Sequence, residues 1–294
     1  MYKPEIGISV SSFTVLKKII FYYEPEPPYV LWDGQYERPY WGIIPHLKDD
    51  LKKIKELGIN TVELCACGAW LKETITDNFG EALQMVKDAG LKVNSVHFPF
   101  AKEYCDIAAK DKDVRLTAVD YFKKIMKIAE PYNPKAFVAH PGYGEVEQEE
   151  SEIFNNFCDS AERLIASTNS KFCVENMVRS KFYSKAEQML KYLDRVKNSY
   201  VCVDTNHFLS DKAEDVIDKF GDRLGAIHVS DYDYVDELHM LPGEGKINWQ
   251  AVIKSLEKAN FNGAFVYELS MGKYGYTYEQ VYNNYVKLFD EYNK

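Results

Sequence analysis

The sequence predicts a closed (β/α)₈ barrel, in which eight parallel strands alternate with eight helices. Three observations favour this fold class. Short runs rich in β-branched residues alternate with longer amphipathic segments along the whole chain. The strand-like runs are continuously apolar, which is typical of parallel strands covered on both faces. The first run is followed by SSFTVLKK, whereas a doubly wound open sheet usually has a glycine-rich phosphate loop there.

The predicted elements follow one another without a break in the pattern. Strands are expected near residues 5–10, 60–64, 92–98, 135–140, 171–176, 200–204, 224–230 and 263–269. In the first helical segment, Leu47, Leu51 and Ile54 recur at helical spacing and Gly58 marks the end. Further helices are expected near residues 77–90, 114–130, 149–167, 184–196, 212–221, 249–260 and 278–292. We therefore expect one barrel domain over residues 1–294, a length common for this fold.

One connection is far longer than the others. Residues 11–44 separate the first strand from the first helix, although a βα loop typically has about 2–6 residues. This insert is rich in aromatic residues, among them Trp32 and Trp41. Because it follows a strand, it leaves the barrel at the face where active sites of this fold lie. We predict a lid whose aromatic side chains cover a polyol; packing on the barrel rim or on a neighbouring subunit is the alternative.

Composition narrows the class of function. The formal net charge of −9 argues against a general affinity for nucleic acid, which depends on neutralising phosphates. No apolar run approaches the ~20 residues that span a membrane, and the N-terminus runs into a strand without a signal peptide. We expect a cytoplasmic protein with reduced cysteines that binds neither nucleic acid nor membrane; association into a homo-oligomer stays open.

Acidic and imidazole side chains end several predicted strands. Glu175, Asp204 and Glu268 each follow an apolar run, where a carboxylate is costly unless it is paired or bound to a cation. His228 has the corresponding place on the strand between the last two. The ends of barrel strands converge on one mouth, so these residues should meet there. Three carboxylates and one imidazole suit one divalent metal: Mn²⁺, Co²⁺, Mg²⁺ or Zn²⁺.

Other polar residues are expected around the same mouth. They follow strands or lie in the loops after them, where they would contact substrate hydroxyls. For a lone histidine in such a place, the alternative is a structural residue held by hydrogen bonds. The predicted substrate-binding residues are Glu63, His97, His140, Arg179, His207, Glu237 and His239, with Trp32 and Trp41 from the insert.

Five motifs carry a resemblance to a known superfamily. They are VEN at 174–176, DTNH at 204–207, HVSD at 228–231, HMLPGEGKINW at 239–249 and YEL at 267–269. In order and spacing they resemble the xylose-isomerase-like TIM barrels, which include sugar (phosphate) isomerases and epimerases and the endonuclease IV family. The resemblance extends over about residues 5–290, with the aromatic insert outside the usual pattern.

The resemblance implies Glu175, Asp204, His228 and Glu268 as metal ligands, and Glu175 and Glu268 as the acid–base pair. A metal that binds a substrate carbonyl and the neighbouring hydroxyl polarises the C–H bond between them. One carboxylate removes that proton to give a cis-enediolate, and a carboxylate returns a proton to another carbon or face. We therefore expect an isomerase or epimerase of a ketose, keto-polyol or related small carbohydrate, with His207 contacting substrate oxygens.

Three alternatives stay open. A keto-inositol dehydratase would use the same ligands and lose water in place of reprotonation. A binding module without catalysis is opposed by the intact pair of glutamates. The third is an endonuclease IV-like phosphodiesterase with three zinc ions acting on abasic DNA, opposed by the acidic net charge and the lack of Arg/Lys clusters. Its nine ligands would match His97, His140, Glu175, Asp204, His207, His228, Glu237, His239 and Glu268, with Glu237 where that family has Asp.

A phosphorylated substrate finds no support in the sequence. There is no glycine-rich phosphate cradle, and the basic residues near strand ends are few: Arg179, Lys181 and Lys273. Arg179 is as compatible with a plain surface loop as with a substrate contact.

Overall fold

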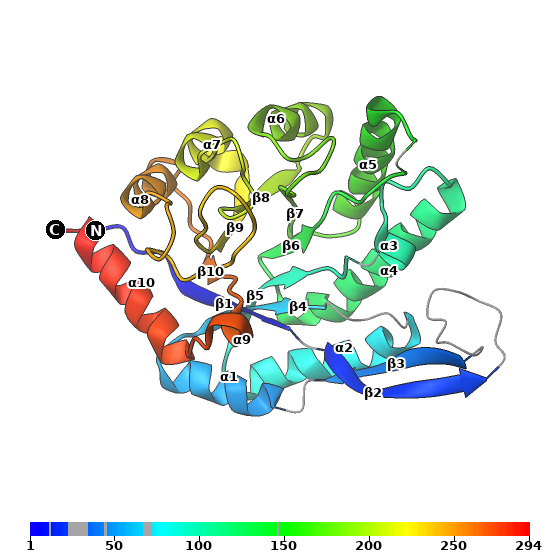
Figure 1. Cartoon of the computed structure of the whole chain (residues 1–294), viewed down its shortest axis with the longest axis horizontal. Helices are drawn as coiled ribbons and strands as arrows, with labels where there is room; N and C mark the ends of the chain where they lie inside the picture. Colours follow the sequence, from blue (N-terminus) through cyan, green and yellow to red (C-terminus); the bar gives the residue numbers. More distant parts are fainter. Residues whose placement is uncertain (12, 23–34, 44–45, 67–71, 101, 146) are drawn as a thin grey trace.

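The computed structural model contains a closed barrel of eight parallel strands (Figure 1). The structure describes residues 1–11, 13–22, 35–43, 46–66, 72–100, 102–145 and 147–294, with the backbone alone for 11, 13–22, 35–43, 72–78 and 103–104. In their order around the barrel, the strands are β1 (Ile6–Ser11), β4 (Thr61–Cys65), β5 (Lys92–His97), β6 (Ala136–Ala139), β7 (Lys171–Glu175), β8 (Tyr200–Asp204), β9 (Leu224–Val229) and β10 (Phe265–Tyr267). The predicted fold class is confirmed, and every barrel strand overlaps its predicted range.

Helices alternate with the strands and pack around them. They are α1 (Leu47–Glu56), α2 (Lys72–Asp88), α3 (Lys102–Cys105), α4 (Lys112–Ala129), α5 (Glu150–Ile165), α6 (Ala186–Arg195), α7 (Ala213–Phe220), α8 (Trp249–Lys258), α9 (Met271–Tyr274) and α10 (Tyr278–Tyr292), with 3₁₀ turns η1 (Glu130–Tyr132) and η2 (Gly221–Arg223). Helix α4 shows why a helix forms and packs at such a place in the sequence. Asp111 caps its N-terminus by accepting from the backbone N–H of Asp113 and Val114, and Phe122 on its buried face stacks on Phe98 beyond the end of β5.

Small side chains fill the inside of the barrel below the strand ends. Ala136, Val138, Cys173, Cys202 and Ala226 form an apolar cluster separate from the large core between strands and helices. Successive side chains of a strand point to opposite faces. Each of β7, β8 and β9 therefore turns a small apolar residue inward and, two residues later, an ionisable one. This alternation places the ionisable side chains as a layer on top of the apolar cluster.

The insert after β1 is a β-hairpin in part, where the sequence suggested a loop. β2 (Phe13–Tyr22) and β3 (Gln35–Ile43) pair antiparallel, and β3 contacts α2, beside which the hairpin lies in Figure 1. The β-branched and aromatic residues of both segments favour such pairing. Trp32 and the side chain of Trp41 lie outside the described residues, so the aromatic lid stays a prediction.

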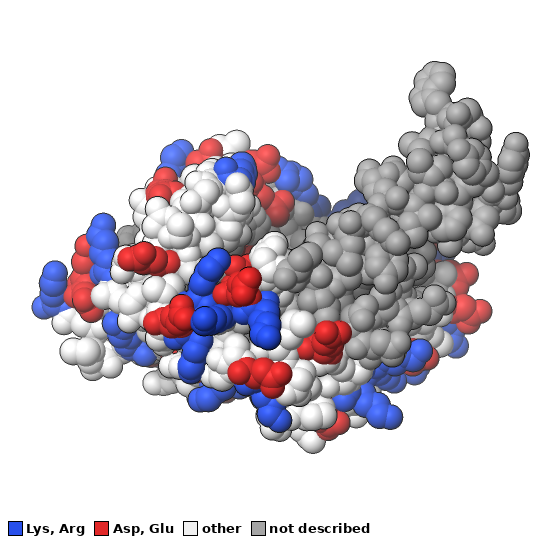
Figure 2. Space-filling view, turned by 90° about the horizontal axis from the view of Figure 1, so that it is seen from below, with Lys and Arg blue, Asp and Glu red and all other residues white. Residues whose placement is uncertain are grey.

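The surface gives two further observations. Over the described part of the chain, no helix has both the length and the apolar character needed to cross a membrane. On the face shown in Figure 2, Lys and Arg side chains are interspersed with Asp and Glu. Among the described residues, Cys105, Cys158, Cys173 and Cys202 are buried and form no disulfide.

The close contact at Gly225 gives a test of the barrel packing. A Cβ on this β9 residue would lie 2.4 Å from Cys173 Sγ and 2.8 Å from Tyr200 Cβ. We expect Gly225→Ala to lower the free energy of unfolding by about 1–3 kcal/mol because it overpacks the core. Urea denaturation measures the change. Gly272→Ala on α9, where a Cβ meets nothing within 4 Å, is the control. Equal stability of the two variants would contradict the packing at β9.

Candidate metal centre

Four consecutive strands bring four possible metal ligands together. Glu175 and Asp204 end β7 and β8, His228 lies one residue before the end of β9, and Glu268 directly follows β10. One donor atom from each of the four lies within 4.8 Å of the others. Glu175, Asp204 and His228 are buried, whereas 31% of the Glu268 side chain is exposed. Glu268 is therefore the member of this group that is most accessible to a molecule entering the mouth.

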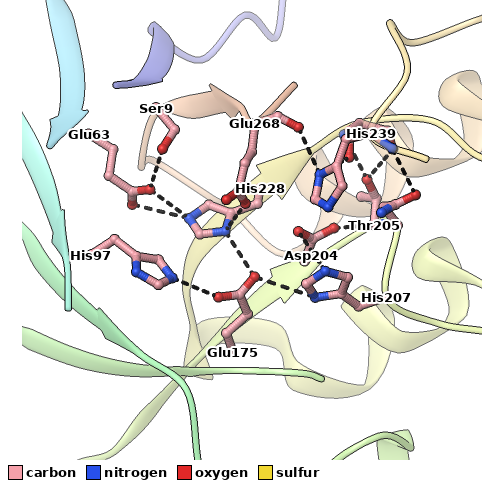
Figure 3. Close-up of polar contacts among 12 residues, drawn as sticks. Ser9, Glu63, His97, Glu175, Asp204, Thr205, His207, His228, His239 and Glu268 are labelled. Atoms are coloured by element: carbon pink, nitrogen blue, oxygen red, sulfur yellow. Dashed lines mark hydrogen bonds and ion pairs between the residues drawn. The ribbon is translucent and has the colours of Figure 1, made fainter. Parts of the chain in front are cut away.

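Glu175 lies at the centre of the site, and imidazoles face both of its oxygens (Figure 3). Oε1 lies 3.1 Å from Nδ1 of His228 and 3.5 Å from Nδ1 of His207. Oε2 lies 3.0 Å from Nε2 of His97 and 3.4 Å from Nε2 of His140. Burial acts to raise the pKa of Glu175, but the surrounding imidazoles, His228 first, outweigh it and hold the pKa well below its usual range. The carboxylate is therefore ionised at neutral pH.

His228 is held between carboxylates on two sides. Its Nε2 lies 3.1 Å from the carboxylate of Glu63, and its Nδ1 lies 2.8 Å from Oε2 of Glu268. Glu63 also accepts from Ser9 Oγ at 3.1 Å and Ser95 Oγ at 2.7 Å. Because a carboxylate accepts, Glu63 favours the tautomer with the proton on Nε2 and turns the Nδ1 lone pair toward the other acids. Glu63, which was predicted to bind substrate, lies on the far side of His228 from Glu175 (Figure 3).

Two further groups flank the first one. His97, His140 and Glu175 form one group, and His207, Glu237 and His239 form the other; in each, the donor atoms lie within 4.8 Å of one another. Nε2 of His207 lies 3.0 Å from Oε1 of Glu237, and Nε2 of His239 lies 3.8 Å from the same atom. The first flanking group shares Glu175 with the four-residue group.

Three of these histidines have the same arrangement. In each, Nδ1 faces a backbone carbonyl, which can only accept, so the ring proton belongs on Nδ1 and Nε2 presents its lone pair. Each Nε2 then faces the carboxylate of its own group, as a metal-ligating histidine does. The contacts are His97 Nδ1 to Phe98 O at 2.7 Å, His207 Nδ1 to Asn176 O at 2.9 Å and His239 Nδ1 to Glu268 O at 3.2 Å.

The arrangement of these donors fits a divalent cation. Within the four-residue group, Oδ2 of Asp204 and Oε2 of Glu268 are buried without a hydrogen-bond partner. Burial raises the pKa of Asp204 to about 7. Buried acceptors without donors are costly, and these two oxygens belong to residues whose donor atoms lie within 4.8 Å of one another. A cation between them would satisfy both, and the mixed oxygen and nitrogen set suits a divalent transition metal or Mg²⁺.

The loop after β9 is fixed by residues that the site prediction did not include. The buried Asp231 carboxylate accepts from the backbone N–H of Gly243 at 2.7 Å, of Ile247 at 3.1 Å and of Tyr232 at 2.9 Å, and from Trp249 Nε1 at 2.8 Å. Asn206 Oδ1 accepts from the backbone N–H of Leu238 and His239. These bonds hold the segment that carries Glu237 and His239. Their sequence signal is that both residues belong to the motifs HVSD and DTNH.

The structure brings most of the predicted site residues together. The mouth contains nine of them: His97, His140, Glu175, Asp204, His207, His228, Glu237, His239 and Glu268. Arg179 is separate from these groups. Its Nη2 lies 2.8 Å from Oδ1 of Asp236 on the exposed rim, so the contact to substrate remains a prediction.

Known proteins share both the sequence pattern and the fold. The profile of the xylose isomerase-like TIM barrel family matches residues 51–287. The chain belongs to this family. It is 26% identical to an uncharacterised protein of Sinorhizobium fredii, over 65% of this chain and 70% of that protein. It is 21% identical to a D-psicose 3-epimerase of Enterocloster bolteae, over 75% of this chain and 76% of that enzyme.

Solved structures of the same fold include several sugar epimerases. The 3-keto-D-glucoside 4-epimerase of E. coli superposes with a TM-score of 0.68 at 17% identity, covering 84% of this chain and 95% of that one. D-psicose 3-epimerase and L-ribulose 3-epimerase are also structural neighbours. At such low identity, the likeness shows the fold.

The contact between Glu63 and His228 gives a test of the centre. In Glu63→Gln the amide can donate to Nε2 and favour the wrong tautomer, so we expect Mn²⁺ to bind about 10–100-fold more weakly. Isothermal titration of the metal-free protein measures the affinity. Ser9→Ala removes one donor to Glu63 but keeps its charge, and should have a smaller effect. Unchanged affinity in Glu63→Gln would contradict the orienting role.

Proposed function

We propose that this protein is a divalent-metal-dependent isomerase or epimerase of a ketose, a keto-polyol or a related small carbohydrate. The observation that carries the proposal is the four-residue group at the mouth, in which Glu268 is partly exposed and the other three residues are buried. The sugar epimerases among its relatives and structural neighbours support the same reaction class. The metal is expected to be Mn²⁺, Co²⁺, Mg²⁺ or Zn²⁺.

The roles of the side chains follow from their positions. A divalent cation at this site would polarise a substrate carbonyl and the neighbouring hydroxyl. Glu175 and Glu268 supply the proton transfer: one carboxylate takes the proton from the carbon that bears the hydroxyl, and the electron pair left behind gives a cis-enediolate. The same carboxylate, now protonated, or the other one after the proton has passed to it, returns the proton to another carbon or to the opposite face. His207, buried beside Asp204, contacts the substrate oxygens.

Glu268 has the pKa that this role needs at the start of turnover. Burial acts to raise the pKa of Glu268, but His228 lowers it to about 2. The group is therefore ionised at neutral pH and begins the reaction as a base. Because it is partly exposed, a substrate can reach it without displacement of the buried layer beneath.

Replacement of Glu268 tests the two-carboxylate scheme. We expect Glu268→Gln to lower kcat at least about 100-fold because the amide cannot accept the proton, while the fold is retained. Interconversion of D-fructose and D-psicose with Mn²⁺ or Co²⁺ is a suitable first assay, and circular dichroism checks the fold. Glu130→Gln, at an exposed glutamate of η1, is the control. Substantial retained activity in Glu268→Gln would exclude the scheme.

A second candidate function is hydrolysis of a phosphodiester in abasic DNA by three zinc ions. The specific observation in its favour is that the two oxygens of Glu175 face imidazoles of different groups, as expected of a carboxylate that bridges two metals. The group of His207, Glu237 and His239 would hold a third ion beside them. Two metals can activate the nucleophile and stabilise the leaving oxygen of such a reaction.

Metal content separates the two functions. For the isomerase we expect about one equivalent of metal per chain, lost in Glu175→Ala because all four ligands are needed. His239→Ala should leave that single equivalent in place. Elemental mass spectrometry of the purified protein measures both. Close to three equivalents of zinc, reduced by about one in His239→Ala, would favour the phosphodiesterase and call for an assay on abasic DNA.

A further inference from the structure

A cavity of about 310 Å³ lies beside the metal centre. His140 lines it and also belongs to the group around Glu175, so the cavity and the centre share a wall. The other walls come from the segments after β5, β6 and β7, three neighbouring strands that end at the same face of the barrel. A substrate whose reacting carbons lie at the metal centre could extend its remaining part into this cavity.

The described lining of the cavity is predominantly basic. Lys102 comes from the segment after β5, and Arg179 and Lys181 come from the segment after β7. Glu145 is the only acidic residue among the lining residues that the structure describes. This balance is opposite to that of the whole chain, whose formal net charge is −9. Like charges gathered around a concave surface attract a ligand of opposite charge, and Arg and Lys are the side chains that bind phosphate most often.

The wall after β6 is rigid. The buried Asp106 carboxylate accepts from the backbone N–H of Tyr143 at 2.9 Å and of Gly144 at 3.1 Å. Gly142 has φ +90°, and a Cβ on it would lie 2.6 Å from Oδ1 of Asp106. The loop is therefore held against Asp106 with no space for a side chain at Gly142, and this wall of the cavity is in place before a ligand binds.

Arg179 has an unusual backbone conformation at the edge of the cavity. Its φ is +60°, in the left-handed region that residues other than Gly, Asn and Asp rarely occupy. The other described residues with positive φ that are neither Gly nor Asn are Tyr234 and His239, both in the loop after β9. Such conformations persist where the surrounding structure holds them, and they cluster at functional sites. All three lie in loops at the mouth.

The guanidinium of Arg179 faces the loop after β9 at the exposed rim of the cavity. It pairs with Asp236, which precedes the Glu237 of the third group, and both partners of the pair are more than half exposed. An ion pair this exposed stabilises the fold very little. The pair instead positions a cation where an anionic ligand in the cavity can take the place of Asp236.

We propose that this cavity is a subsite for a phosphate monoester on the substrate whose carbons react at the metal centre. The proposal rests on the proposed function for the reacting part of the substrate, and it adds the chemical class of the distant part. Arg179, Lys181 and Lys102 bind the phosphate and thereby select phosphorylated over free sugars. The sequence alone offers no support for a phosphorylated substrate because the three cations come from two separate loops and form no motif.

Paired substrates test the subsite in the metal-loaded enzyme. The probes are D-ribulose and D-ribulose 5-phosphate, and the readout is the ratio of the two KM values. Arg179→Ala and Asp236→Ala both remove the ion pair, but only the first removes the cation. We expect the ratio of KM for the phosphate ester to KM for the free sugar to be about tenfold or more higher in Arg179→Ala than in Asp236→Ala. The reason is that only Arg179→Ala loses a charge-assisted hydrogen bond to the phosphate. Lys181→Ala should shift the ratio in the same direction. Equal ratios in Arg179→Ala and Asp236→Ala would overturn the proposal.

Binding of inorganic phosphate separates the subsite from the reaction. Equilibrium dialysis should show phosphate bound to the metal-loaded native protein and to Asp236→Ala, and about tenfold weaker binding to Arg179→Ala. If neither sugar is turned over but this pattern appears, the subsite stands and the proposed function fails. If the free sugar is turned over and phosphate binds equally to all three proteins, the function stands and the subsite is wrong. Phosphate that is lost with the metal but retained in Arg179→Ala would lie on the metal, which also overturns the proposal.

Discussion

The constraint on which the site depends is the burial of several ionisable groups at one end of a barrel. Glu175, Asp204 and His228 have almost no exposed surface, and Glu63 is buried behind them. Carboxylates in such a place are tolerated only when imidazoles or cations face them. Every buried acid of this layer has an imidazole within 4 Å, and the unpaired carboxylate oxygens of Asp204 and Glu268 belong to the same four-residue group. The protein thus accepts an electrostatic cost that a divalent cation would relieve.

The barrel supplies this layer through strand register. Asp204 on β8 is the register partner of His228 on β9. Glu175 on β7 is the register partner of Cys202, two residues before Asp204. Small residues below the layer let the barrel close, while the ionisable ones above fill its mouth. Residues distant in sequence therefore meet because their strands are paired and the register brings the strand ends together.

Much of the fold and of the metal centre could be predicted from the sequence for this reason. A carboxylate that follows an apolar run can be recognised in the sequence alone. Closure of the barrel then brings the ends of the strands together. The hairpin of β2 and β3 was missed because an insert without helical spacing was read as a loop. That Glu63 orients His228 and that Asp231 anchors the loop after β9 could not be predicted, because both roles depend on hydrogen bonds with residues from other segments of the chain. The cluster of Lys102, Arg179 and Lys181 depends on how two loops fold, which no local pattern specifies.

Two loops at the mouth are held in the same way, each by one buried aspartate. Asp106 accepts backbone N–H groups of the loop after β6, and Asp231 accepts those of the loop after β9. A charged acceptor makes stronger bonds to N–H groups than a neutral one, and removal would leave several donors unsatisfied in a buried place. One aspartate thus fixes the wall of the basic cavity, and the other fixes the segment of Glu237 and His239. The barrel strands set the reacting end of the site, whereas these two anchored loops shape what surrounds it, so substrate preference can change without disturbance of the buried layer.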